Sequence, residues 1–370
     1  MFSTFLKEIS GYFDRRFLLS AFFPVLAFAG LSLGMSLILW GPQTLVKLWQ
    51  EFPVELQVLA TAGALGVILF IAYLFHVFQT GLTRLYEGYW DRIPVLGWWG
   101  EFRRAFYKRI WEYLNGESES LATKITEVES IALEGETLLQ KRERKQRAEE
   151  LRDQLGKLER EWFLFLPPGK AYIMPTRLGN VLRASEFYSL KRYNLDAVVA
   201  WPRLQSLLPK DFAEGLRDEK ANLDLLLVVT TLAGIFAFGW ELGLGLFTDR
   251  WDLFLLASPG WILALASYFS ALQAARSYGE LIKAAFDLHR WELLKALHLK
   301  LPESYKEERE LWKDVSELLY RNYPPAPEVF HYETEKAKPP TPSLKPSFIQ
   351  RGLFALVHLF CLDDEAEKKE

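Results

Sequence analysis

The chain has 370 residues and a formal net charge of −3; 50% of its residues are hydrophobic and 25% are charged. The single cysteine, Cys361, excludes an intrachain disulfide and a cysteine cluster for zinc or iron–sulfur, and the small net charge indicates no particular class of partner. A mean hydropathy of zero beside so many charges requires apolar blocks separated by charged ones. The 13 Trp, 15 Tyr and 27 Phe fit such a chain, because aromatic side chains gather at membrane interfaces.

The first two apolar runs predict a pair of membrane-spanning helices after a cytosolic N-terminus, residues 1–16. They extend from Phe17 to Trp40 and from Leu56 to Leu82, and the first holds no charged side chain. At about 1.5 Å per residue, a helix over the first run covers about 36 Å, enough for the ~30 Å hydrocarbon layer. The segment "AFA" at 27–29 is typical of a signal cleavage site, but the run continues beyond a signal core of about 7–15 residues. We therefore expect a retained anchor and a first transmembrane hairpin, residues 17–82.

Two further apolar runs predict a second transmembrane hairpin, residues 223–275. They extend from Leu225 to Thr248 and from Leu253 to Ala275, and Glu241 is the charged residue within them. The short connection between the spans of each pair requires them to run antiparallel. Small residues four apart let helix backbones approach closely, so they predict the packing faces. These pairs are Gly30/Gly34, Ala62/Gly66 and Gly239/Gly243.

Basic residues beside the spans predict the orientation, because cytosolic loops carry an excess of lysine and arginine. The two outer loops hold one basic residue each, Lys47 and Arg250. The opposite flanks are rich in them: Lys7, Arg15, Arg16, Arg84, Arg92, Arg103, Arg104, Lys108, Arg109, Arg276 and Lys283. We expect a multi-pass protein of the plasma membrane with both termini and the long middle region in the cytosol.

The middle region, residues 83–222, predicts a cytosolic helical domain. Its first part, residues 84–114, alternates aromatic with basic residues, which is typical of an interfacial helix that meets anionic headgroups; packing of the same aromatics on the domain is the alternative. Heptad-like apolar spacing in 121–132 and 151–162 predicts a helical hairpin or short coiled coil, within one chain or between subunits, so we expect a homo-oligomer. The basic run 141–147 is interrupted by the acidic Glu143, which indicates a solvated helix face and no nucleic-acid partner.

The C-terminal part predicts cytosolic helices over residues 276–323, then a proline-rich linker, a short apolar helix and a charged tail over 324–370. The apolar stretch from Leu353 to Leu362 is too short to span a membrane, so it docks on the domain or lies at the interface. Together the predicted elements describe an all-α integral membrane protein with four transmembrane helices in two hairpins and a cytosolic helical domain.

No catalytic or cofactor-binding motif is present, and the five histidines lack the spacing of a helical metal site. We therefore expect no cofactor and no metal, and no residue identifies an enzyme. Polar residues within the spans are better candidates, because they are costly there and often functional. The candidates are His76, Gln79, Asp224 and Glu241.

The second and third spans run in opposite directions, which predicts the depth of these polar residues. The first two candidates are expected to lie level with Asn222 and Asp224 and to contact them. Glu241 is expected near the outer end, where Lys47 or Arg250 would pair with it. Two interpretations stay open: adhesion between helices together with snorkelling at the interface, and a proton or ion pathway lined by several subunits.

The stretch from Met174 to Leu204 is a basic connector that precedes the third span. Pro175 and the apolar spacing after it predict the start of a helix, and Pro202 predicts an end or a bend. Arg177 and Arg203 either pair with Glu186 and Asp196 within the domain or hold lipid or other phosphates. The candidate set is Arg177, Arg183, Glu186, Asp196 and Arg203.

Three segments resemble segments of uncharacterised bacterial multi-spanning membrane proteins: "RLYEGYW" (84–90), "MPTRLGNVLRASE" (174–186) and "RYNLDAVVAWPRL" (192–204). The resemblance implies a bacterial source, hence the inner membrane, and a joint importance of the three segments. It implies no activity and no site residue.

The expected function is that of a non-enzymatic scaffold, sensor or signalling component that uses its cytosolic helical domain for partner or self association. The alternative is a subunit of an oligomeric ion channel or transport complex, because four spans with both termini inside are compatible with subunits around a pore. Membrane lipid is the other expected partner.

Overall fold

The computed structural model describes residues 14–91, 93–130, 137–248, 250–321 and 330, and these residues form helices and turns with no strand among them. Four helical stretches are long and apolar enough to cross a membrane: Arg15–Trp40, Val54–Val77, Lys210–Phe247 and Trp251–Ala296. The prediction of an all-helical chain with four span-length apolar helices is confirmed. The proline-rich linker, the apolar stretch from Leu353 to Leu362 and Cys361 lie outside the described residues.

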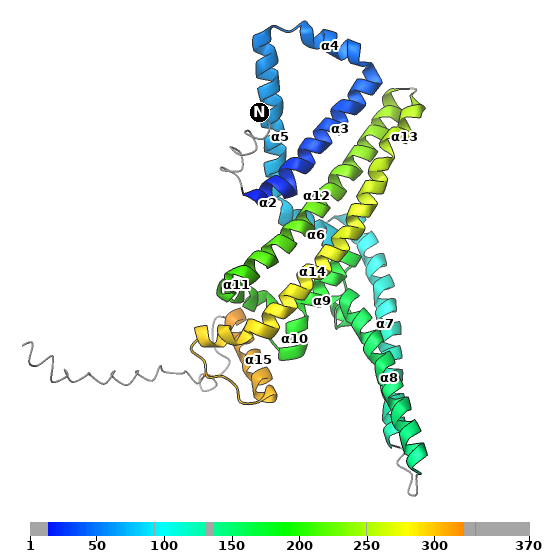
Figure 1. Cartoon of the computed structure of the whole chain (residues 1–370), viewed down its shortest axis with the longest axis vertical. Helices are drawn as coiled ribbons and strands as arrows, with labels where there is room; N and C mark the ends of the chain where they lie inside the picture. The colour runs from blue at the N-terminus through cyan, green and yellow to red at the C-terminus, as the bar shows by residue number, and fades with distance from the viewer. Residues whose placement is uncertain (1–13, 92, 131–136, 249, 322–329, 331–370) are drawn as a thin grey trace, which may run out of the picture.

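The first candidate span is one continuous helix with a wider turn near its start. It consists of α2 (Arg15–Phe17), the π-helical turn η1 (Leu18–Phe22) and α3 (Phe23–Trp40), and Asp14 caps it by accepting from the backbone N–H of Arg16. A glycine with φ of 82°, Gly41, ends it, because only glycine adopts such a backbone readily. Helix α4 (Pro42–Gln50) then leads to the second candidate span, α5 (Val54–Val77). Helices α3 and α5 diverge from their shared base, and α4 bridges their far ends (Figure 1).

An arm of two long helices projects from the rest of the molecule (Figure 1). Helix α6 (Gln79–Glu87) ends at Gly88, and the arm follows as α7 (Pro94–Ser130) and α8 (Leu138–Phe165). Thr137 and Gln140 form a capping box at the start of α8, which satisfies N–H groups that the first turn leaves free. Near the base, the rings of Trp111 and Trp162 meet edge to face with centroids 5.5 Å apart. The arm is therefore a helical hairpin within one chain.

The remaining helices build the body and the other two candidate spans. They are η2 (Lys170–Tyr172), α9 (Arg177–Glu186), α10 (Tyr188–Tyr193), α11 (Ala197–Leu207), α12 (Lys210–Phe247), η3 (Trp251–Leu253), α13 (Phe254–Ala257), α14 (Pro259–Ala296) and α15 (Tyr305–Arg321). Helices α12 and α14 pack along one another and continue from the apolar segments into the body (Figure 1).

The packing face between α12 and α14 differs from the one that small-residue spacing predicts. A Cβ at Gly260 would lie 2.9 Å from both the Ala233 carbonyl oxygen and the Ala237 Cβ, so this glycine lets the two backbones meet. The predicted glycines Gly30, Gly34, Gly66, Gly239 and Gly243 have open space where a Cβ would be, and Ala62 is exposed. The expectation for these faces is wrong within the chain, because spacing of small residues does not say which side of a helix meets a neighbour.

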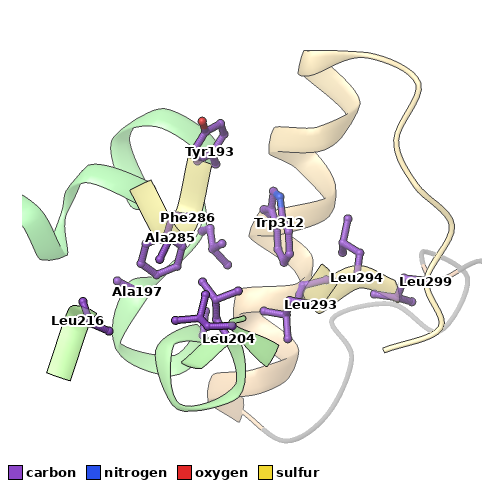
Figure 2. Packing of buried hydrophobic residues seen from close by; sticks show 14 of the residues in the cluster. Tyr193, Ala197, Leu204, Leu216, Ala285, Phe286, Leu293, Leu294, Leu299 and Trp312 are labelled. Carbon is purple, nitrogen blue, oxygen red and sulfur yellow. The ribbon is translucent and has the colours of Figure 1, made fainter. Parts of the chain in front are cut away.

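The body has its own hydrophobic core, shown in Figure 2. Trp312 and Phe286 are its largest fully buried side chains, and they bring α15 and α14 together with α11. Beside it, the Glu308 carboxylate is 4% exposed and accepts from Arg290 Nε at 2.7 Å and from Trp291 Nε1 at 2.6 Å. Although burial raises the pKa of Glu308, these hydrogen bonds outweigh it and leave the pKa below its usual range.

Candidate functional site

Two of the connecting segments meet through their backbones where α6 ends. Gly88 has a φ of 96° and lies against Pro175, so a side chain at this position would be strained and would collide with the proline ring. A Cβ at Gly179 would collide with the Glu87 carbonyl oxygen, which also accepts from Thr176 Oγ1 at 2.8 Å. The contact between α6 and α9 therefore requires both glycines.

Asn180 holds the turn that precedes α9. Its side chain is 0% exposed; Oδ1 accepts from the Met174 N–H at 2.8 Å, and Nδ2 donates to the carbonyls of Met174 and Thr176 at 2.9 Å each. Thr176 caps the helix by accepting from the Gly179 N–H at 2.9 Å. These bonds satisfy backbone groups that burial would otherwise leave without partners.

Helix α9 is wedged between three other helices. Leu178, Val181 and Leu182 pack into one cluster with Leu223 of α12 and Ala275 of α14. A Cβ at Gly279 of α14 would collide with Ser185 Oγ, so α9 also approaches α14 closely. The wedge joins α6, which follows the second candidate span, to both helices of the second pair.

A cavity of about 530 Å³ lies beside this wedge, between α6, α9, α11, α12 and α14; we call it the junction cavity. Its lining has an apolar part that includes Trp201, Leu223 and Phe286. The charged side chains that line it are Arg84, Glu87, Arg183, Glu186 and Lys220. The cavity is therefore amphipathic, with an apolar wall and a charged rim.

Glu87 carries an unusual charge environment within the junction cavity. Among the described residues, its carboxylate has no ion pair and no hydrogen bond. Burial raises the pKa of Glu87 to about 7, the neighbouring Glu186 adds to the shift, and Arg183 and Lys220 oppose it. Burial raises the pKa of Glu186 as well, against its ion pair with Arg183 at 3.2 Å.

Two residues that line the junction cavity each hold one buried polar atom that has no partner within the described part of the chain. The Thr83 side chain is 7% exposed and its hydroxyl makes no hydrogen bond. Arg183 donates to Glu186 at 3.2 Å and to the Tyr89 hydroxyl at 2.9 Å, yet its Nε also makes none. Buried polar groups without partners are rare in native proteins, because each costs about 1–3 kcal/mol.

The candidate charges of the connector are not paired as the spacing suggested. Arg183 pairs with Glu186, while Arg177 lies over the Phe165 ring with 5.2 Å from Cζ to the centroid. Arg203 donates to the Val199 carbonyl at 2.7 Å, and Asp196 accepts from the Val198 N–H at 2.8 Å, which caps α11. Of the two alternatives for Arg177 and Arg203, the pairing with Glu186 and Asp196 is not found among the described residues.

The two prolines of the connector also have different outcomes. Pro175 lies directly before Thr176, the N-cap of α9, so the predicted helix begins beside it. Pro202 lies inside α11, and the helix continues beyond it to Leu207. The helix continues because the burial of Ala200 and Leu204 on the body core outweighs the one hydrogen bond that proline cannot make.

The polar residues of the candidate spans find partners other than those expected. Gln79 Nε2 donates to Ser20 Oγ at 3.0 Å, and the His76 ring meets Phe17 edge to face with centroids 5.4 Å apart. These contacts join the second candidate span to the first. Asp224 is buried and pairs with Lys220, one turn before it on the same helix.

Glu241, near the other end of α12, accepts from Trp261 Nε1 at 2.9 Å. The expected partner Arg250 pairs instead with Asp252 at 2.8 Å. The donor to Glu241 is therefore Trp261 on α14, whereas a basic residue of an outer loop was expected.

Local spacing in the sequence did not identify Glu87, Thr83 and Lys220 as site residues. Thr83 and Glu87 on α6 lie about 90 to 140 positions from the lining residues on α9 and α12, so no local spacing reveals that these residues meet. The one available signal was the resemblance of residues 84–90 and 174–186 to segments of the same proteins, and these two segments meet in the structure.

No group of histidine, cysteine, aspartate and glutamate side chains within the described ranges is arranged to hold a metal ion. Comparison of the chain with protein-family models, with curated proteins and with solved structures finds no match. The geometry of the chain itself is therefore the basis for assigning a function.

Proposed function

We propose that the protein is a four-span inner-membrane protein with its spans in two antiparallel pairs, and that it acts as a non-enzymatic scaffold or sensor. Both termini, the body and the arm lie in the cytosol, and the arm of α7 and α8 is the surface on which a partner or a second copy docks. One observation carries this proposal: the base of the arm is fastened to the ends of the candidate spans.

Both helices of the arm are attached at that base. Gly100 of α7 lies against Trp90 and Pro175, within the contact between α6 and α9. At the end of α8, the Phe165 ring lies 4.0 Å from Arg276 Cζ, and Arg276 follows the fourth apolar segment on α14. A shift of the fourth span would therefore move the arm, because cation–π contacts and close packing link the two directly.

The rest of the arm is free for docking. Its helices bury few residues, and the ion pair between Arg152 and Glu129 links them away from the base. The surface is a mixture of exposed acidic and basic residues, which keeps an unoccupied arm soluble. Such a surface supports recognition by charge complementarity more than by apolar burial.

The first turns of α7 support the expected contact with anionic headgroups. Trp98 is 74% exposed, and Trp99, Phe102 and Phe106 are also exposed. Large aromatic side chains on a helix that follows a span gain free energy at the headgroup level. The neighbouring Arg104 pairs with Asp91 at 2.8 Å and Glu101 at 2.5 Å, which leaves Lys108 and Arg109 for lipid phosphates.

The channel alternative receives less support. A cavity of about 520 Å³ between α3, α12 and α14 is lined by apolar side chains such as Phe28, Leu232 and Leu263. A conduction path needs polar groups or water, so this space suits a lipid chain rather than an ion. A symmetric ring of subunits with a polar central axis, seen for the purified protein in lipid, would reverse this preference.

Topology is tested with single cysteines in a Cys361→Ser background. Asp252→Cys is expected to react with a membrane-impermeant thiol reagent in intact cells, and Glu150→Cys on the arm only after lysis. Labelling of the arm in intact cells would contradict the orientation.

Docking is tested with a thiol cross-linker in isolated membranes. We expect Glu150→Cys to give a discrete adduct, at the mass of two chains for a second copy or at another fixed mass for a partner. Tyr320→Cys, exposed on the body, is the matched control and is expected to give none. The absence of adducts from any exposed position along the arm would overturn the docking role.

A further inference from the structure

The junction cavity combines features that a structural contact between helices does not need. Its lining includes Glu87, whose carboxylate makes no ion pair and no hydrogen bond among the described residues, and an apolar wall lies opposite the charged rim. A cavity that only separated packed helices would be lined by paired or apolar groups, because unpartnered polar groups reduce stability. These groups indicate a ligand that supplies hydrogen-bond donors.

The position of the cavity indicates where that ligand comes from. Thr80 and Thr83 follow the second candidate span, Leu223 precedes the third apolar segment, and Tyr278 follows the fourth. The second candidate span and the third and fourth apolar segments therefore end at the level of the cavity. In the proposed topology this level is the cytosolic headgroup region.

The charges of the cavity select the chemistry of the ligand. A carboxylate without an ion pair suits a primary ammonium, which donates hydrogen bonds to it; a quaternary ammonium donates none. Arg84, on the exposed rim, has no ion pair among the described residues and suits a phosphate. The cations closer to the carboxylates are neutralised, because Arg183 pairs with Glu186 and Lys220 with Asp224.

We infer that the junction cavity binds a zwitterionic headgroup in which a primary ammonium and a phosphate are joined by a short carbon link, as in an aminophospholipid of the phosphatidylethanolamine type. Glu87 holds the ammonium, Arg84 holds the phosphate, and the apolar wall around Leu223 and Trp201 contacts the start of an acyl chain. The lipid source rests on the proposed membrane topology, whereas the headgroup chemistry does not.

An anionic lipid without an amine fits the cavity less well. Its phosphate would meet Arg84 in the same way, but the lipid would offer no ammonium to the Glu87 carboxylate. The ammonium group is therefore the feature that sets the specificity.

The test measures binding to the purified full-length chain in detergent, by native mass spectrometry and by the shift of the thermal midpoint. The probes are phosphatidylethanolamine, phosphatidylcholine, phosphatidylglycerol and soluble phosphoethanolamine. We expect the ethanolamine lipid to bind at least about tenfold more tightly than the choline and glycerol lipids, which corresponds to about 1.4 kcal/mol.

Variants assign the binding to the cavity. Glu87→Gln is expected to remove the preference for the ethanolamine lipid, and Arg84→Gln, at an exposed position, to weaken both ethanolamine probes. Glu214→Gln, exposed on α12 and away from the cavity lining, is the matched control and is expected to bind like the unmodified chain. Binding is also expected to tighten as the pH rises through about 7, where Glu87 becomes charged.

The outcomes separate the sources and the proposals. Comparable binding of soluble phosphoethanolamine would support the headgroup chemistry with a soluble ligand. Equal binding of all three lipids, unchanged by Glu87→Gln and Arg84→Gln, would overturn the inference. Because purified protein is used, neither result depends on the docking role of the arm or on the labelling that tests topology.

Discussion

The two pairs of apolar helices use the same kind of sequence in opposite ways. In the most apolar window of α12, 44% of the residues are buried, against 6% in that of α5. Helices α12 and α14 pack along their length and continue into the body, whereas α3 and α5 meet at their base and diverge (Figure 1). Hydropathy alone does not distinguish the pairs; the presence of a close-approach residue such as Gly260 does.

The open pair is held at its base, and α3 is also held near its far end. Phe17, Phe22 and Val25 of the first candidate span pack with Ala72 of α5 and Val228 of α12. The Arg16 guanidinium also pairs with Asp218 at 3.0 Å. Near the far end, Met35 of α3 packs with Leu244 of α12 and with η3 and α13. Among the described residues of α5, Ala72 near the base is the buried one, and the rest of the helix exposes apolar surface that lipid covers in the proposed topology, so α5 is the more deformable helix of the pair.

The largest effect is expected at the wedge that joins the packed pair to the rest. Asn180→Ala leaves the buried N–H and the buried carbonyl of Met174 without partners, and should lower the free energy of unfolding by about 3 kcal/mol. Thermal and denaturant unfolding in detergent measure it. Asn115→Ala, which removes an exposed hydrogen bond to Glu119 on the arm, is the control and should change stability by less than about 0.5 kcal/mol. Equal losses of stability in the two variants would show that the wedge contributes no more to the free energy of unfolding than the arm does.

A direct comparison of the two pairs uses one substitution in each. Gly260→Leu forces a side chain between α12 and α14 and should cost about 2 kcal/mol, because a packed interface cannot absorb the added volume. Gly34→Leu in α3 enters open space and should cost less than about 0.5 kcal/mol. The same unfolding measurement applies, and a larger loss for Gly34→Leu would show that the open pair closes in the native protein.

A smaller effect is expected at the base of the open pair. Gln79→Leu removes the hydrogen bond to Ser20 and should cost about 1 kcal/mol, in the range measured between membrane helices. We also expect broader distances between spin labels at the far ends of α3 and α5, measured by pulsed electron resonance. Unchanged distances would show that the base does not hold the pair.

The smallest effect concerns the pH dependence of stability. Because the folded chain raises the pKa of Glu87 from 4.5 to about 7, the folded state binds more protons than the unfolded state between these values. Stability should therefore rise as the pH falls from about 7 toward 4.5. Glu87→Gln should reduce this slope in the thermal midpoint, with a remainder from Glu186, whose pKa is also raised. Glu214→Gln should keep the full slope, and a slope unaffected by Glu87→Gln would contradict the assignment.

Several local features could be predicted from sequence because they depend on neighbours in the chain. Apolar runs predicted four span-length helices, and Pro175 predicted the start of α9 within two residues. The partners of Gln79, Arg177 and Glu241 could not be predicted in this way. Glu241 contacts Trp261, 20 positions away, and Gln79 contacts Ser20, 59 positions away. Many pairings over such separations are compatible with one sequence.

The sequence by itself determined the helical character, the four apolar stretches and the charged surface of the arm, because hydropathy and helix periodicity act over a few turns. The tertiary structure alone decided which pair of apolar helices packs and which stays open, and that residues 84–90 meet residues 174–186. It also decided the state of Glu87: a carboxylate on a surface helix is ordinary, and its raised pKa arises only when α9, α11, α12 and α14 exclude water from around it.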